Sequence, residues 1–193
     1  MGLCKRLVAR LDIKGNKLIK GVRFEGLRVI GDPIETVERY SQEGIDEILF
    51  IDAVASLYGR NSLCEILKET TRKVFVPITA GGGIKCVDDA ANLLKSGADK
   101  IAVNTEALRR PELIKELSEA FGSQCVVVSI QARRTGQGSW EAMTEAGREP
   151  SGKEVLTWCK QVEELGAGEI LLTSVDQDGT CKGSDQELIK HAA

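Results

Sequence analysis

The chain has 193 residues, of which 42% are hydrophobic and 28% charged, and its formal net charge is −3. These values are typical of a soluble globular protein with a sizeable core. No long basic run suggests a nucleic-acid groove or a membrane surface. The apolar runs have the length of strands and are too short to span a membrane. The N-terminal stretch lacks the apolar core and cleavage site of a signal peptide.

Cysteine and histidine usage narrows the possible chemistry. Six cysteines are scattered without a Cys-x-x-Cys pair, at positions 4, 64, 86, 125, 159 and 181. We expect reduced thiols in a cytoplasmic protein. The only histidine is His191, so Ser-His-Asp triads, histidine bases and zinc sites are not expected, and we predict neither metal nor cofactor. Catalysis would rely on carboxylates, lysines, hydroxyls and backbone dipoles.

Strands and helices are expected to alternate along the chain. Runs rich in Val, Ile and Leu, typical of parallel strands covered by helices, lie at 6–13, 45–54, 74–80, 99–103, 124–131 and 168–174. Start signals such as Asp32-Pro33 and stop signals such as Gly97 and Gly122 predict helices between them. These helices are expected from 33 onward, at 61–73, 86–96, 111–121 and 153–165, and from about 185. Six β-α units in a row predict a parallel sheet with right-handed crossovers.

An open doubly wound sheet and a (β/α)8 barrel both fit this alternation. The first strand is not followed by Gly-x-Gly-x-x-Gly, which counts against a dinucleotide-binding sheet. Long loops are expected at 14–31 and 132–150, after the first and fifth strands. A barrel places its active site on that side of the strands.

An internal repeat favours the barrel. "GIDEIL" at 44–49 recurs 122 residues later as "GAGEIL" at 166–171, and "LVARLDIK" has a looser echo in "VVVSIQAR", which aligns Asp12 with Gln131. We therefore predict a (β/α)8 TIM barrel made of two related half-barrels. The chain is expected to be a single incomplete domain with about six β-α units. Residues 1–122 would form the N-terminal half and 123–193 part of the C-terminal half. Because the sequence stops inside a helix, at "LIKHAA", we also expect truncation.

Glycines and polar residues follow two neighbouring strands. "TAGGGIK" (79–85) ends the third strand with three glycines, whose backbone N–H groups could cradle an anion beside a helix N-terminus or form a simple tight turn. Asn104 and Thr105 end the fourth strand on the same face. Gly83, Asn104 and Thr105 are therefore predicted to form a phosphate site.

The sixth strand also ends in a polar, glycine-containing segment. "TSVDQDGTCKG" (173–183) contains Thr173, Ser174, Asp178 and Gly179. It is a second candidate binding site or an ordinary Asx-rich turn.

Two carboxylates end strands inside otherwise apolar runs. Asp12 ends the first strand and Asp52 the second. A carboxylate at the C-terminal end of a barrel strand is a candidate general acid or base, or else a cap. Lys14 and Lys20 could supply positive charge to an anionic substrate, or be solvated.

A set of charged residues lies near the starts of the strands: Arg6, Glu47, Lys100 and Glu169. A barrel would bring them together as a ring of alternating charge at its bottom face. Independent surface ion pairs would contribute little, so a clustered ring suggests a structural plug or a gate.

Several segments, in chain order, together resemble the HisF family, the cyclase subunits of imidazole glycerol phosphate synthase. They are "ARLDIKGNKLIKG", "GDP", "GIDEILFIDAVAS", "TAGGGI", "GADKIAVNTEAL", "FGSQCVVVSI" and "GAGEILLTSVDQDGT". The resemblance implies a two-half (β/α)8 barrel and a lyase/cyclase reaction in histidine biosynthesis. Ammonia from a glutaminase (HisH-like) subunit, docked on the N-terminal face of the barrel, would attack a bis-phosphate ribulosyl aminoimidazole carboxamide intermediate. The products would be imidazole glycerol phosphate and an aminoimidazole carboxamide ribotide.

The resemblance also implies roles for individual residues. The catalytic positions are Asp12, Gln131 and Lys20. The phosphate-binding positions are Gly83, Asn104, Thr105, Asp178 and Gly179. Other substrate-binding positions are Asp52, Thr173 and Ser174. The ammonia gate matches Arg6, Glu47, Lys100 and Glu169.

Gln131 departs from the family pattern, because it stands at the place of a second catalytic aspartate. An amide cannot ionise to carry a proton, and positioned proton transfer is worth about 10²–10⁴ in rate. Arg10 is a second departure, where the family usually has a small residue. "VASLYGRNSL" (54–63) also resembles a subgroup found with surface-sugar biosynthesis.

Three functions therefore remain open. The first is the histidine-pathway cyclase. The second is a glutaminase partner that supplies ammonia for amidation of a surface-polysaccharide sugar. The third is a non-catalytic partner that channels ammonia or binds phosphate. A related sugar isomerase of the same pathway is disfavoured, because it needs no charged gate.

Overall fold

The computed structural model describes residues 5–55 and 63–193. Six strands form its centre: β1 (Val8–Lys14), β4 (Glu47–Asp52), β5 (Ile78–Gly81), β6 (Lys100–Val103), β7 (Val126–Gly136) and β10 (Glu169–Ser174). Each pairs in parallel with the next in this order. The predicted α/β fold of the TIM-barrel type, with about six β-α units, is therefore confirmed. Among the described residues no strand joins β10 to β1, so the strands form an open arc.

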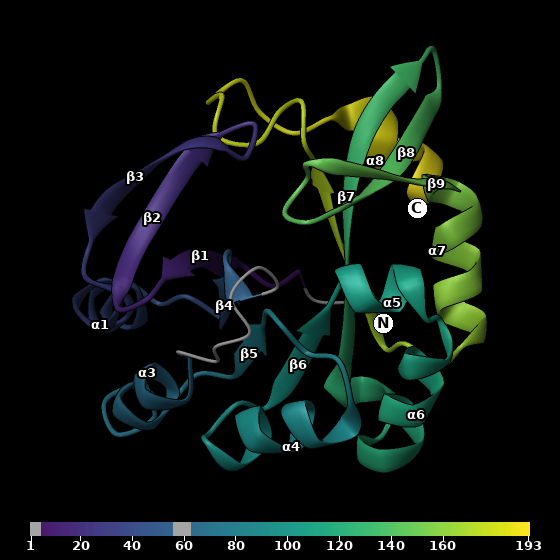
Figure 1. The fold of residues 1–193 in the computed structure, drawn as a ribbon. Helices are drawn as coiled ribbons and strands as arrows, with labels where there is room; N and C mark the ends of the chain where they lie inside the picture. The colour runs from purple at the N-terminus through teal and green to yellow at the C-terminus, as the bar shows by residue number, and fades with distance from the viewer. Residues whose placement is uncertain (1–4, 56–62) are drawn as a thin grey trace.

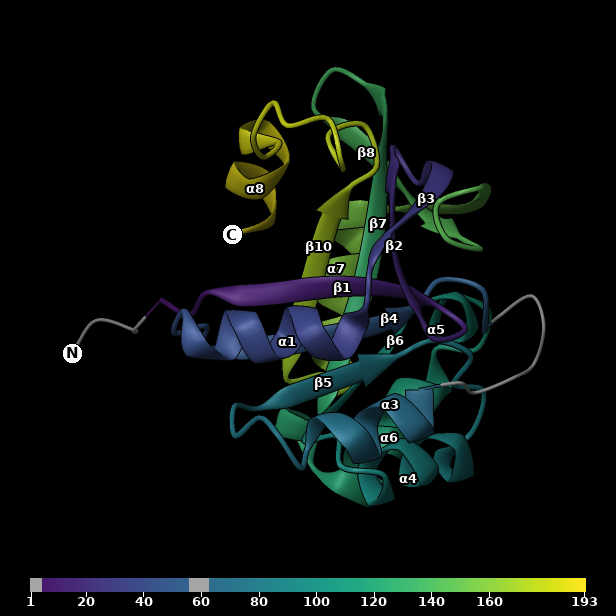
Figure 2. The ribbon, with the colours of Figure 1, turned by 90° about the vertical axis from the view of Figure 1, so that its left-hand side faces the viewer.

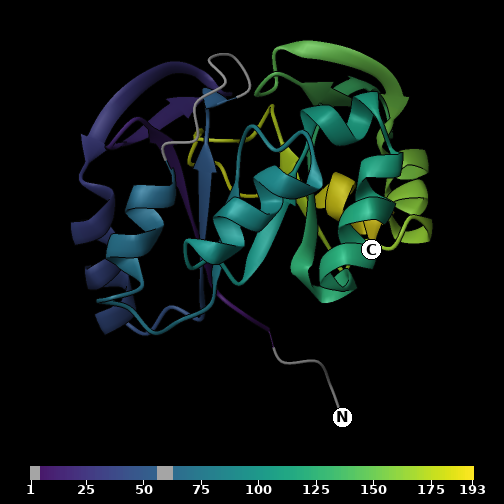
Figure 3. The same ribbon diagram turned by 60° about the horizontal axis from the view of Figure 1, so that its bottom comes forward.

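The helices follow the strands at the predicted places. They are α1 (Pro33–Gln42), α3 (Leu63–Thr70), α4 (Val87–Lys95), α5 (Thr105–Arg109), α6 (Glu112–Phe121), α7 (Val155–Glu164) and α8 (Gln186–Ala192), with a short 3-10 helix η1 at Ser123–Cys125. Figure 2 shows α1 running along β1, with α3, α4 and α6 following on the same side of the arc. In Figure 3 these helices form a row from blue through teal to green in front of the strands. Among the helices of the described residues, α5 and the short η1 were not expected from the sequence.

Local signals explain where the helices begin. The Asp32 carboxylate accepts hydrogen bonds from the N–H groups of Ile34 and Glu35, and Pro33 is the first residue of α1. No helix within the described ranges combines the length and the apolar character that crossing a membrane requires.

The segments 14–31 and 132–150 are not plain loops, and that prediction was wrong. The first contains β2 (Lys17–Val22) and β3 (Glu25–Gly31), and the second contains the end of β7 with β8 (Ser139–Thr144) and the start of β9 (Glu149–Glu154). Lys14 pairs with Lys17 across a Gly15-Asn16 turn, which is a two-residue hairpin signal. The hairpins extend the sheet above the ends of β1 and β7 (Figure 1).

In the central strands of the arc both faces are buried, whereas Val8 of β1 and Ile170 of β10, at its two edges, are exposed. Residues facing the helices, such as Phe50 and Val128, belong to the main core, whereas Leu49, Ala102 and Val127 form a separate cluster. Since successive side chains of a strand point to opposite faces, this second cluster lies on the inner face of the arc. The sequences of the central strands lack alternating polar residues because both faces of these strands are buried.

The loop after β10 is held against the β2–β3 hairpin. The Arg23 N–H donates to the Asp178 carbonyl at 2.8 Å. Gly179 has a φ of +71°, and a Cβ there would lie 2.2 Å from the Gly21 carbonyl oxygen. Figure 1 shows this yellow loop reaching the purple hairpin. Two segments far apart in sequence are therefore fixed together above the arc.

Gly179→Ala is expected to loosen this contact. Left-handed backbone costs a non-glycine residue about 1–2 kcal/mol, and the clash with Gly21 adds to that cost. Gly183→Ala is the matched control, because its φ is +87° but nothing lies within 4 Å of the added Cβ. Urea unfolding should show a larger loss of stability for Gly179→Ala, by about 1 kcal/mol or more. Equal losses would mean that the close approach to Gly21 does not matter.

Candidate functional site

The inner face of the arc carries three layers of side chains. Strand pairing places Val8 opposite Glu47, Arg10 opposite Leu49 and Asp12 opposite Ile51. On the other side of the arc, Glu169 pairs with Val127 and Thr173 with Gln131. Along the strands, charged residues lie near the starts and polar residues near the ends. The inner residues between them are apolar except for Arg10, whose guanidinium contacts Asp12 and Thr173.

The first layer is a closed ring of ion pairs. Arg6 contacts Glu47 at 2.6 Å and Glu169 at 3.1 Å, while Lys100 contacts Glu169 at 2.7 Å and Glu47 at 3.1 Å. The Thr79 hydroxyl donates to Glu47 at 2.7 Å. The Glu47 side chain is only 4% exposed, and burying a carboxylate requires such partners. Thr79 was not predicted, although it begins its strand like the others.

The ring shifts the ionisation of its exposed members. Burial raises the pKa of Glu169, but hydrogen bonds from Lys100 and Arg6 outweigh it and leave the pKa below the ordinary value. The hydrogen bond to Glu169 and the two nearby carboxylates raise the pKa of Arg6. Glu169 and Arg6 therefore both favour their charged forms.

The second layer is apolar. Leu49, Ala102 and Val127 are buried there, and Ile51 and Leu171 pack against them. This layer separates the charged ring from the polar layer above it.

The glycine-rich loop lines a cavity of about 80 Å³ in the third layer. Gly82 and Gly83 have φ values of +122° and +70°, and a Cβ would lie 2.7 Å from the Asp52 carbonyl oxygen or 2.9 Å from the Ala55 Cβ. Only glycine fits both the conformation and the contact. Lys85 also lines this cavity, and its ammonium group has no ion pair within residues 5–55 and 63–193.

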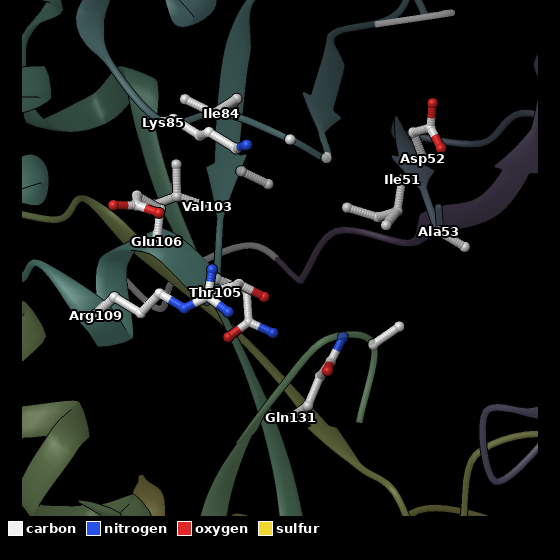
Figure 4. Close-up of a pocket in the computed structure, with 15 residues that line it drawn as sticks. Ile51, Asp52, Ala53, Ile84, Lys85, Val103, Thr105, Glu106, Arg109 and Gln131 are labelled. Carbon is white, nitrogen blue, oxygen red and sulfur yellow. The ribbon is translucent and has the colours of Figure 1, made fainter. Parts of the chain in front are cut away.

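Asn104, Thr105 and Gln131 line the same cavity. Figure 4 shows Gln131 on the side of the pocket opposite Lys85. Gln131 is 5% exposed, and its Oε1, like the Oδ1 of Asn104, is buried without a hydrogen-bond partner among the described residues. The Thr105 hydroxyl accepts from the Glu145 N–H. Buried acceptors without partners are costly, so Oε1 and Oδ1 are positioned to accept hydrogen bonds from a ligand.

A second, smaller cavity adjoins the first and is lined by Asp12, Arg10, Asp178 and Gln131. The two oxygens of Asp12 contact different cations: Oδ1 lies 2.9 Å from Arg10 Nε, and Oδ2 lies 3.4 Å from Lys20 Nζ. The predicted catalytic positions Asp12, Gln131 and Lys20 are thus close together.

Arg10 fills the space between the first and last strands. Its guanidinium also donates to the Thr173 hydroxyl at 3.0 Å and lies 5.3 Å from the centre of the Phe24 ring. The sequence identified Arg10 as unusual but gave it no role.

The remaining predicted residues lie near this layer. Asp52 is buried and accepts a hydrogen bond from the Val54 N–H, so it caps the turn that follows β4. Ser174 is buried and donates to Asp185 at 3.3 Å. Thr173, Asp178 and Gly179 line an open hollow beside β10. The described residues contain no group of His, Cys, Asp and Glu that could hold a metal.

Comparison with known proteins identifies the family. The family described as "Histidine biosynthesis protein" matches residues 6–193. The chain belongs to this family.

Two relatives in the family carry the same name. The chain is 58% identical over 188 residues to the "Imidazole glycerol phosphate synthase subunit HisF" of Legionella pneumophila, covering 97% of this chain and 89% of that protein. It is 47% identical over 184 residues to the protein of the same name from Gluconacetobacter diazotrophicus, covering 95% and 71%. The predicted membership of the HisF family is confirmed. Most of the segment 54–63, which resembles a surface-sugar subgroup, lies outside the described residues.

In this member of the histidine biosynthesis family, Glu169→Gln should weaken the fold in a pH-dependent way. Because the native pKa of Glu169 lies below its ordinary value of 4.5, its ion pairs stabilise the protein above that pH. This contribution is lost as the pH falls through the lowered native pKa. Urea unfolding between about pH 7 and pH 3 should show the difference from wild type shrinking with acid. Glu164→Gln, at the exposed end of α7, is the control, and a difference that persists at low pH would contradict the expectation.

Proposed function

We propose that the chain is the ammonia-using cyclase subunit of an imidazole glycerol phosphate synthase, a lyase of histidine biosynthesis. The observation that carries the proposal is the stacking of an ion-pair ring, an apolar layer and the Asp12 site on one inner face. The names of the two relatives support the same activity.

The two ends of the strands have different tasks in this function. A HisH-like glutaminase docks at the strand starts, where the Arg6 and Glu169 side chains are 48% and 35% exposed. Ammonia passes the ring, which acts as a gate, and then the apolar layer. Neutral ammonia crosses apolar surroundings at far lower cost than ammonium does. The order of the layers thus suits the delivery of ammonia to Asp12.

The strand ends hold the phosphorylated substrate. Gly83, Asn104 and Thr105 bind one phosphate of the ribulosyl aminoimidazole carboxamide intermediate, with Lys85 as a cation beside them. The loop with Gly179 lies by the other end, and Asp52, Thr173 and Ser174 are near the substrate between them. Cyclisation then yields imidazole glycerol phosphate and the aminoimidazole carboxamide ribotide.

We also propose that residues 1–122 form one half-barrel and that residues 123–193 form part of a second, related one. The repeat aligns Glu47 with Glu169, and both carboxylates contact Arg6 and Lys100. The two halves thus supply equivalent residues to one ring. As its compartment we propose the cytoplasm, since the described cysteines are free thiols.

Gln131 favours a second candidate function, the supply of ammonia for amidation of a surface-polysaccharide sugar. Its amide cannot act as an acid or a base, and a different substrate would remove the need for two carboxylates. A partner that only channels ammonia or binds phosphate would not need Asp12 either.

Turnover of the bis-phosphate substrate with an ammonium salt distinguishes these functions. Wild-type protein is expected to turn over, and Asp12→Asn should lower kcat by about 10²–10⁴, because a positioned proton acceptor is lost. Asp88→Asn on the exposed surface of α4 is the control and should match wild type. No turnover in wild type, with turnover in Gln131→Asp, would favour the sugar or scaffold function.

A further inference from the structure

We propose that Asp178 is a positioning residue for proton transfer, which holds the Lys20 ammonium against Asp12. Lys20 and Asp12 then carry the two proton transfers for which Gln131 is chemically unfit. This inference rests on the proposed cyclase function and assigns Asp178 a role other than phosphate binding.

The role proposed for Asp178 rests on the contacts of the Lys20 ammonium group. Its Nζ lies 2.8 and 3.0 Å from the two Asp178 oxygens and 3.4 Å from Asp12 Oδ2. Both Asp178 oxygens thus accept hydrogen bonds from the Lys20 ammonium, and these bonds position it beside Asp12. The Asp12 and Asp178 side chains are 10% and 14% exposed, so neither contact is freely solvated. Asp12, Asp178 and Gln131 also line one cavity.

Phosphate binding is a poor role for the Asp178 side chain. Its carboxylate is anionic and would repel a phosphate at close range. The nearby cation, Lys20, is occupied by two carboxylates and so is not free to bind a phosphate. The Gly83 loop differs, because its cavity combines glycines with Lys85, whose ammonium is unpaired within the described residues.

The backbone around Asp178 is fixed from several sides. Its carbonyl accepts from the Arg23 N–H at 2.8 Å, and its own N–H donates to the Ser174 carbonyl at 3.0 Å. Gly179 packs directly on Gly21, one residue after Lys20 in β2. Such support from neighbouring groups keeps a site within the narrow geometry that proton transfer needs.

Arg10 contacts the other oxygen of Asp12. Its guanidinium contacts Oδ1 at 2.9 Å, so Asp12 faces one cation at each oxygen. The Lys20 ammonium carries a transferable proton and the Asp12 carboxylate has oxygens that can accept one. In the proposed step Asp12 is the proton acceptor, and the ammonium of Lys20 is the donor.

Asp12 and Lys20 account for both protons that move in the proposed step. Ammonia adds to the ketone of the ribulosyl group, so the N–C bond forms and the C–O π bond breaks. The nitrogen gives one proton to Asp12, and the oxygen takes one from Lys20. Asp12 then returns its proton to the Lys20 amine across their contact. The product of the step is a neutral carbinolamine, and both residues regain their starting charge.

Asp178→Asn tests the inference in the full chain, with the bis-phosphate substrate and an ammonium salt. We expect kcat to fall about tenfold or more while KM stays within about twofold, because the interaction acts in the transition state. Adding Gln131→Asp to this variant should restore much of the lost kcat by supplying a second carboxylate. Asp176→Asn is the loop control, since Asp176 accepts from the Arg134 N–H away from Lys20, and it should match wild type.

Every outcome of this experiment either supports or overturns the role proposed for Asp178. An unchanged kcat in Asp178→Asn, or a raised KM alone, overturns the inference and leaves the cyclase function intact. Asp178→Glu, which keeps the charge, should retain more of kcat than Asp178→Asn at similar melting temperature; equal losses point to a structural role and overturn it. Turnover in Gln131→Asp but not in wild type overturns the inference and also the histidine-pathway reaction proposed for the wild-type chain. No turnover in either protein overturns the cyclase function and the inference with it.

Discussion

The in-register pairing of parallel strands is the constraint on which the rest of the structure depends. Pairing fixes which residues of neighbouring strands lie side by side, with a stagger that accumulates around the arc, and the alternation of side chains fixes which of them face inward. A shift of one residue in any strand would turn its inner side chains towards the helices. The ring, the apolar layer and the Asp12 site therefore all depend on the same strand register.

The bottom and top layers solve the same electrostatic problem in different ways. In the ring, two cations alternate with two carboxylates, so every charge has two opposite neighbours and the buried Glu47 is compensated. At the strand ends, Asp12 forms ion pairs with Arg10 and Lys20, and Lys20 also forms an ion pair with Asp178. The ring is balanced and closed, which suits a gate, whereas the top layer opens to a cavity, which suits chemistry.

Gln131 and Arg10 change the top layer in a coordinated way. Where the family resemblance implies a carboxylate, Gln131 is neutral, and Arg10 adds a positive charge beside the remaining Asp12. Within the part of the chain that the structure describes, the Gln131 Oε1 is buried without a hydrogen-bond partner, a cost that a bound hydrogen-bond donor would remove. Under the proposed function, residue 131 acts as a hydrogen-bond acceptor, and the acid–base task that the resemblance assigns to it would belong to the neighbouring charged groups.

The sequence by itself determined the order of elements and the family. The apolar runs, Asp32-Pro33 and Gly122 are local signals, because strand burial and helix ends depend on nearby residues. The positions of Arg6, Glu47, Lys100 and Glu169 near the strand starts of a barrel also predicted that these charged residues would meet. Only the tertiary structure decided the register-dependent details: that Thr79 joins the ring, that Arg10 spans from Asp12 to Thr173, and that the two long segments form hairpins. The reason is physical, since these contacts join residues far apart in sequence, and their distances follow from strand pairing and loop packing that no local pattern encodes.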